Sequence, residues 1–150
     1  MTVAHLLPKV LVLAILPALL LAACLSEAGP TLSAPEAFEQ MRSGQITLID
    51  IRTPPEWRQT GVPEGARRID MRHPKGPEGF AAEVLTAVGG DKDAPIALIC
   101  RTGNRTTQVQ KELLARGFTH VYNVKEGMVG SGAGPGWLKR GLPVEPCKLC

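Results

Sequence analysis

An apolar run that ends in a cysteine is the feature that most constrains how this chain can fold. Residues 96–99 read Ile-Ala-Leu-Ile, and Cys100 follows directly. A polar loop with one glycine comes next, and residues 106–116 then carry apolar side chains at helical spacing. A short apolar run is typical of a buried strand, and the strand–loop–helix order is typical of a parallel sheet. We therefore predict an α/β domain with Cys100 at the carboxyl end of a central strand.

The other segments continue this alternation of helices and strands. Ser33 and Glu36 have the spacing of a capping box, which satisfies the first free N–H groups of a helix. We expect a mostly parallel sheet with helices on both faces, and a flexible surface loop over the glycine-rich residues 127–136. The expected elements are helices at 33–44, 77–88 and 106–116, strands at 46–51, 96–99 and 120–124, and a weaker strand at 66–71.

The first 23 residues differ in character from the rest of the chain. After a short, weakly basic start, residues 10–21 are apolar apart from Pro17. Such a run is typical of a secretory signal, because a membrane-spanning helix needs about 20 apolar residues. The segment Leu21-Ala22-Ala23-Cys24 also resembles the cleavage box of bacterial lipoproteins.

That resemblance implies a signal peptide at 1–23, a lipid on Cys24 and a tether at 24–32. The domain would then lie on the periplasmic side of a bacterial envelope, attached to the membrane by its lipid. Two alternatives stay open. Cleavage after Ala28 would give a soluble periplasmic protein, and an uncleaved segment would act as an anchor.

Charge and cysteine content bound the function further. The net charge is +3, with the basic residues scattered along the chain, so we expect no nucleic-acid partner. In an oxidising compartment Cys147 and Cys150, in the tail at 145–150, could form a disulfide and leave Cys100 unpaired. No second ligand pair completes a zinc site with these two, so no metal is expected.

The loop after the strand favours an ionised cysteine. Backbone N–H groups and a helix N-terminus would present partial positive charge to the Cys100 sulfur, and Arg101 and Arg105 would add full charges. Gly103 and Asn104 tolerate the positive φ that a tight loop requires. Two arginines beside a buried strand also indicate an anion nearby. The plain alternative is an inert buried cysteine at the end of a strand.

The chain resembles the rhodanese-like family over residues 33–144. Beyond the loop at 100–105, the resemblance includes Leu48-Ile49-Asp50-Ile51-Arg52 and Glu56-Trp57. It continues through Gly61-Val62-Pro63-Glu64-Gly65-Ala66 and ends with Glu126-Gly127-Met128, Trp137 and Gly141-Leu142-Pro143-Val144. The resemblance implies a three-layer α/β fold with a mostly parallel sheet between two layers of helices.

The resemblance also implies a sulfurtransferase that needs no cofactor. Cys100 would take sulfur from a small donor such as thiosulfate, carry it as a persulfide and pass it to a thiol or to cyanide. Whether the chain has a protein partner stays open. The residues implied for binding around the nucleophile are Arg101, Thr102, Gly103, Asn104 and Arg105.

The roles of four other residues are less direct. Asp50 and Arg52 would support the loop, although a structural ion pair explains them at least as well. Trp57 and Trp137 are expected to pack in the core or over the site. Cys147 and Cys150 would form a disulfide that pins the tail, or would accept sulfur from the Cys100 persulfide.

The sequence departs from the family pattern in two places. The second motif usually reads Gly-His-Ile-Pro-Gly-Ala, whereas this chain lacks the histidine and inserts Glu64 before Gly65. Residues 130–136 lengthen the C-terminal motif, which could alter the rim of the site and the choice of acceptor. Two other functions stay open: a non-catalytic binding module of the cell envelope, and a cysteine phosphatase. A phosphatase loop, however, would place the arginine one residue later than Arg105.

Overall fold

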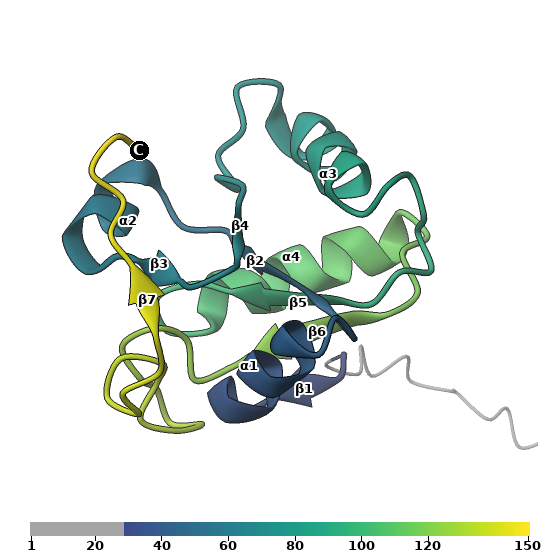
Figure 1. Ribbon diagram of the computed structural model, residues 1–150. Helices are drawn as coiled ribbons and strands as arrows, with labels where there is room; N and C mark the ends of the chain where they lie inside the picture. The colour runs from purple at the N-terminus through teal and green to yellow at the C-terminus, as the bar shows by residue number, and fades with distance from the viewer. Residues whose placement is uncertain (1–28) are drawn as a thin grey trace, which may run out of the picture.

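Five short parallel strands form the central sheet of the computed structural model, which describes residues 29–150 (Figure 1). Their spatial order is β1 (Thr31–Leu32), β6 (Val121–Val124), β5 (Ile96–Ile99), β2 (Thr47–Asp50) and β4 (Arg67–Arg68). A separate antiparallel ribbon pairs β3 (Val62–Pro63) with β7 (Val144–Glu145). The expected α/β architecture with a mostly parallel sheet is confirmed.

Helices cover both faces of this sheet (Figure 1). They are α1 (Ala34–Arg42), α2 (Pro54–Thr60), α3 (Gly76–Ala87) and α4 (Asn104–Ala115). Because side chains alternate along a strand, Ala97 and Ile99 of β5 join the apolar cluster that includes Ala37 of α1 and Trp57 of α2. The side chains on the other face join the cluster formed with α3 and α4. The sheet is thus buried on both sides, which explains its continuous apolar strands.

The helix after the cysteine begins earlier than the sequence predicts. The apolar spacing points to residue 106, but α4 starts at Asn104. Gly103 is the N-cap and adopts a left-handed φ of 84°, so the chain turns into the helix directly after the loop. Arg105 therefore lies in the first helical turn.

Other differences follow from short-range sequence effects. Pro54 and Pro55 begin α2, which was not among the expected helices; a proline in the first helical turn loses no hydrogen bond. The weak strand expected at 66–71 is reduced to Arg67–Arg68. Strands β1, β3 and β7 have two residues each, too few to show a periodic pattern.

The glycine-rich segment at 127–136, where we expected a flexible surface loop, is exposed in its middle but buried at its ends. Gly127, Met128 and Gly136 are buried, and Ser131 pairs with Gly134 in a tight turn. The buried Glu126 holds the segment, since its carboxylate accepts hydrogen bonds from the N–H groups of Ala34 (2.6 Å) and Gly136 (2.8 Å). The start of the segment thus borders the cysteine loop, and its end is held by Glu126.

The carboxylate of Glu126 is ionised in this position. Burial opposes ionisation, but the hydrogen bonds from Arg140 Nε (2.8 Å) and from the two backbone N–H groups outweigh it, so the pKa of Glu126 is lowered. One carboxylate thereby connects the start of α1, the glycine-rich segment and Arg140.

Candidate active site

Cys100 lies at the carboxyl end of β5, in the middle of the sheet. From β2 the chain runs to the edge strand β4, whereas from β5 it runs through α4 to β6 on the other side. This reversal of direction is the position where parallel α/β sheets usually bind ligands. Cys100 is 1% exposed, and within residues 29–150 it is the one cysteine outside a disulfide.

Two groups of the following turn contact the Cys100 sulfur. The backbone N–H of Gly103 donates a hydrogen bond to Sγ at 3.2 Å. The hydroxyl of Thr106 lies 3.6 Å from Sγ, and it also donates to the carbonyl of Gly103 at 2.9 Å. Both groups belong to the beginning of α4, where free N–H groups and the helix dipole favour a negative charge. Thr106 was not among the predicted site residues.

Arg105 reaches the sulfur from the first turn of α4 and is held by a carboxylate. Its guanidinium pairs with Glu56 of α2 through contacts of 2.5 and 2.8 Å. The hydrogen bond to Glu56 raises the pKa of Arg105, and the neighbouring Cys100 raises it further. The same bond from Arg105 lowers the pKa of Glu56 from 4.5 to about 2. The two arginines led us to expect an anion near the loop. For Arg105 that anion is the carboxylate of Glu56.

Glu56 is the site residue that sequence reasoning treated only as part of a motif. It is the third residue of α2, where its carboxylate also accepts hydrogen bonds from the N–H (3.1 Å) and hydroxyl (3.0 Å) of Thr53. The Thr53–Glu56 spacing is that of a capping box, which predicts a helix start. The sequence carries no local signal that this carboxylate meets Arg105.

The other predicted loop residues contact the rest of the protein through their backbone atoms more than through their side chains. Arg101 and Asn104 are exposed, and Thr102 is half-buried. The carbonyls of Cys100 and Arg101 accept hydrogen bonds from Met128 (2.9 Å) and Val129 (3.1 Å). The loop is thus attached along one edge to the segment after β6. We expected two arginines near the sulfur, but only Arg105 lies there.

Two glycines allow this close attachment. A side chain on Gly103 would collide with the backbone of Lys125, and one on Gly127 would collide with the backbone of Arg101. Both residues also adopt a positive φ, 84° and 64°, which side chains disfavour. The loop around Cys100 is consequently rigid on the side that faces residues 125–129.

Asp50 and Arg52 form a buried ion pair, as the alternative interpretation of these residues proposed. Their side chains are 0% and 1% exposed, and Arg52 Nη2 lies 2.6 Å from the carboxylate. Arg52 also donates to the hydroxyl of Thr60 (2.6 Å) and to the carbonyl of Gly61 (2.7 Å). The pair therefore ties β2 to the end of α2.

Both tryptophans pack in the core, as expected. Trp57 is 7% and Trp137 0% exposed, and both belong to the apolar cluster on the α1 face. The indole N–H of Trp137 donates to the carbonyl of Pro143 at 3.0 Å. The ring thereby holds the segment that leads into β7.

Cys147 and Cys150 are joined in a disulfide, and their Cα atoms lie 5.5 Å apart. Among residues 29–150 no three His, Cys, Asp or Glu side chains cluster as a metal site would require. Cys24, the predicted lipid attachment point, lies outside the described residues.

The fold agrees with the comparisons to known proteins. The family model of the rhodanese-like domain matches residues 33–132, and the chain belongs to this family. The thiosulfate sulfurtransferase GlpE of Pseudomonas aeruginosa is 30% identical over 94 residues, covering 63% of this chain and 76% of that protein.

Two solved structures extend the comparison. The polysulfide-sulfur transferase homodimer of Wolinella succinogenes is 29% identical with a TM-score of 0.57, covering 77% of each chain. A Rhodopseudomonas palustris protein of unknown function, a possible tyrosine phosphatase, is 25% identical with a TM-score of 0.56, covering 77% of this chain and 84% of its own.

Proposed function

We propose that this protein is a sulfurtransferase that moves sulfane sulfur from a donor such as thiosulfate to a thiol or to cyanide. The observation that carries the proposal is the Cys100 sulfur at the end of β5, which accepts the Gly103 N–H and neighbours the Arg105 guanidinium. Membership of a family that includes a thiosulfate sulfurtransferase relative supports the reaction class.

The reaction has two displacements at sulfur. The Cys100 thiolate attacks the outer sulfur of thiosulfate, whose S–S bond breaks, and sulfite leaves with the electron pair. The acceptor thiolate or cyanide then attacks the terminal sulfur of the persulfide, and the Cys100 thiolate is restored. Cys100 leaves as a thiolate in the second step, so a donor N–H and a nearby cation lower the barrier to that step.

Arg105 is the group best suited to hold the donor. Its side chain is 32% exposed and that of Glu56 is 19% exposed, whereas Cys100 is buried beside them. A guanidinium has five N–H donors in a planar fork, and Glu56 engages only its two terminal nitrogens. The sulfonate of thiosulfate would share this fork, which places the outer sulfur toward Cys100.

The proposal is tested by cyanide-dependent thiocyanate release with thiosulfate as donor. We expect turnover by the wild type, none by Cys100→Ser, and unchanged turnover by the control Thr86→Ala, an exposed position on α3. Turnover that survives in Cys100→Ser would contradict the proposal.

The same preparations separate the alternatives. Cys100-dependent hydrolysis of p-nitrophenyl phosphate without thiocyanate release would favour a phosphatase, the function suggested for the Rhodopseudomonas palustris neighbour. A folded protein with neither activity would favour a binding module.

We also propose that the domain is exported and lipid-anchored through Cys24. No helix within residues 29–150 is long and apolar enough to cross a membrane. Cell fractionation tests the proposal: the wild type should sediment with membranes, and Cys24→Ala should not be lipid-labelled. Cytoplasmic protein with Met1 intact would contradict export.

A further inference from the structure

The C-terminal disulfide is a second sulfur centre, and its placement is unlike that of a structural cross-link. Cys147 and Cys150 both lie in the tail that follows β7, so their bond closes a loop inside the tail. A disulfide stabilises a fold by closing a chain loop, and the stabilisation grows with the length of that loop. This bond joins residues three apart and leaves the tail unconnected to the domain.

Other contacts hold the tail in place. β7 pairs with β3, and the guanidinium of Arg58 on α2 donates a hydrogen bond to the carbonyl of Cys150. Figure 1 shows the C-terminus beside α2. The disulfide is therefore not needed to attach the tail.

A cation is directed at both sulfur atoms. Arg68 Nη1 lies 2.6 Å from Cys147 Sγ and 3.2 Å from Cys150 Sγ. Arg68 belongs to β4, 79 residues away from Cys147 in sequence, so the fold brings this contact together. A neutral disulfide is a weak acceptor, whereas a thiolate is a strong one. The arginine thus favours the reduced pair more than the oxidised pair.

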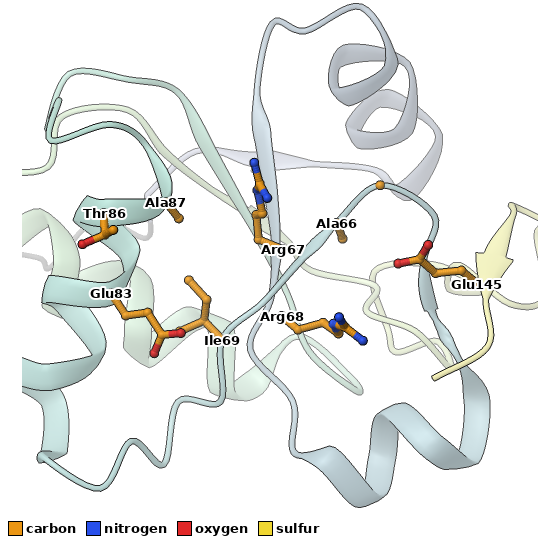
Figure 2. Close-up of a pocket in the computed structure, with 9 residues that line it drawn as sticks. Ala66, Arg67, Arg68, Ile69, Glu83, Thr86, Ala87 and Glu145 are labelled. Carbon is orange, nitrogen blue, oxygen red and sulfur yellow. The ribbon is translucent and has the colours of Figure 1, made fainter. Parts of the chain in front are cut away.

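The neighbouring Arg67 provides an internal contrast. Figure 2 shows the side chain of Arg68 directed toward the segment of Glu145, while that of Arg67 points the other way. Successive side chains of a strand alternate in this manner. The two arginines share a strand and an exposed position, but only Arg68 contacts the sulfurs.

The disulfide can be reached from solvent. Cys147 is buried, Cys150 is half-buried, and Leu149 between them is fully exposed. Cys147 lines depressions on two sides, one shared with Arg58 and Lys148, the other with Arg68, Lys148 and Leu149. An incoming thiolate thus meets a basic rim, and Cys150 is the less buried residue of the pair.

We propose that Cys147 and Cys150 form a redox-active site that exchanges with a dithiol. The first thiolate of the dithiol attacks Cys150 Sγ, the S–S bond breaks, and Cys147 leaves as a thiolate beside Arg68. The second thiolate of the dithiol then attacks the dithiol sulfur that is bonded to Cys150. Cys150 is released as a thiolate and takes a proton from water. Two electrons pass from the dithiol, which becomes a disulfide, to Cys147 and Cys150. This activity is separate from sulfur transfer at Cys100.

The test uses the full chain with Cys24→Ser and Cys100→Ser, so that the pair supplies all remaining thiols. The probe is dithiothreitol, with alkylation and intact mass to count the thiols released over time. We expect reduction about tenfold faster than that of oxidised glutathione under the same conditions, because a stabilised leaving thiolate departs faster.

Matched variants identify the cause of that reactivity. Arg68→Ala should slow reduction about tenfold and shift the equilibrium in a glutathione buffer about tenfold toward the disulfide. Arg67→Ala should leave both quantities unchanged, and Arg68→Lys should restore part of the loss. Circular dichroism checks that each variant is folded.

Two results would overturn the proposal. One is equal reactivity of Arg68→Ala and Arg67→Ala; the other is a wild-type pair that reacts no faster than oxidised glutathione. Since Cys100 is absent from these proteins, either result would leave the proposed sulfur transfer unaffected.

Discussion

Two carboxylate–guanidinium pairs, Asp50 with Arg52 and Glu56 with Arg105, differ in their surroundings. Arg52 and Asp50 are at most 1% exposed, and every nitrogen of the Arg52 side chain has a partner inside the protein. Arg105 and Glu56 are 32% and 19% exposed and lie beside the Cys100 sulfur. The first pair has no capacity left for a ligand. The second pair keeps N–H donors that a ligand could use. The same kind of ion pair therefore stabilises the fold in one place and contributes to the candidate site in the other.

The largest expected effect comes from breaking the buried pair. Asp50→Asn leaves Arg52 charged and without its counter-ion, which costs about 3–5 kcal/mol of unfolding free energy. Urea denaturation measures the loss. The sulfurtransfer rate per folded molecule should change little, because neither residue contacts the sulfur. A loss below about 1 kcal/mol would show that the pair is not part of the framework.

Removing the guanidinium beside the cysteine should mainly affect the reaction. Arg105→Gln is expected to slow sulfur loading from thiosulfate about 100-fold, as the loss of one preorganised donor does in other enzymes. Arg101→Gln is the matched control, since that side chain is exposed and lies in the same loop. Stopped-flow loading rates distinguish the two. Equal losses would contradict the assignment of Arg105 as the donor-binding residue.

The pH dependence of stability tests the Glu56–Arg105 pair directly. Because the pKa of Glu56 falls from 4.5 to about 2 on folding, its ionised form stabilises the protein above pH 4.5. That contribution is lost as the pH falls through the window from 4.5 toward 2. Glu56→Gln should cost about 2 kcal/mol at pH 7, and the difference from wild type should shrink across this window. A difference that is independent of pH would refute the pairing.

The smallest effect is expected at a largely exposed pair. Glu39 and Arg42 on α1 lie 3.7 Å apart with side chains more than 60% exposed. Glu39→Gln should change the unfolding free energy by less than about 0.5 kcal/mol, since exposed ion pairs are screened by water and salt. A larger change would mean that the exposure of an ion pair does not determine how much it contributes to stability.

The elements that the sequence predicts well are those whose signals are local. Residues 96–99 are all apolar, so β5 and the position of Cys100 at its end follow directly. The capping box at Ser33 and Glu36 predicts α1, and both of its hydrogen bonds form. In each case the pattern and the contact lie within a few residues of one another.

The features that the sequence misses depend on contacts between distant segments. Arg105 meets Glu56 from 49 residues away, and Arg68 meets Cys147 from 79 residues away. No local pattern encodes such pairs, because the packing of α2, α4 and the tail on the sheet brings them together. The burial of both ends of the segment at 127–136 was missed for the same reason, since the buried Glu126 carboxylate accepts the N–H of Gly136.

Intact mass after incubation with thiosulfate tests the central claim most directly. The reduced full chain and Cys100→Ser are each treated with thiosulfate, and the excess reagent is removed. Mass spectrometry then gives the intact mass, and peptide mapping locates any added sulfur. We expect the wild type to gain one sulfur atom on the peptide that contains Cys100, and to lose it on addition of cyanide. Cys100→Ser should gain none. A folded wild type that gains no sulfur, or a sulfur located on Cys147 or Cys150 alone, would contradict Cys100 as the carrier.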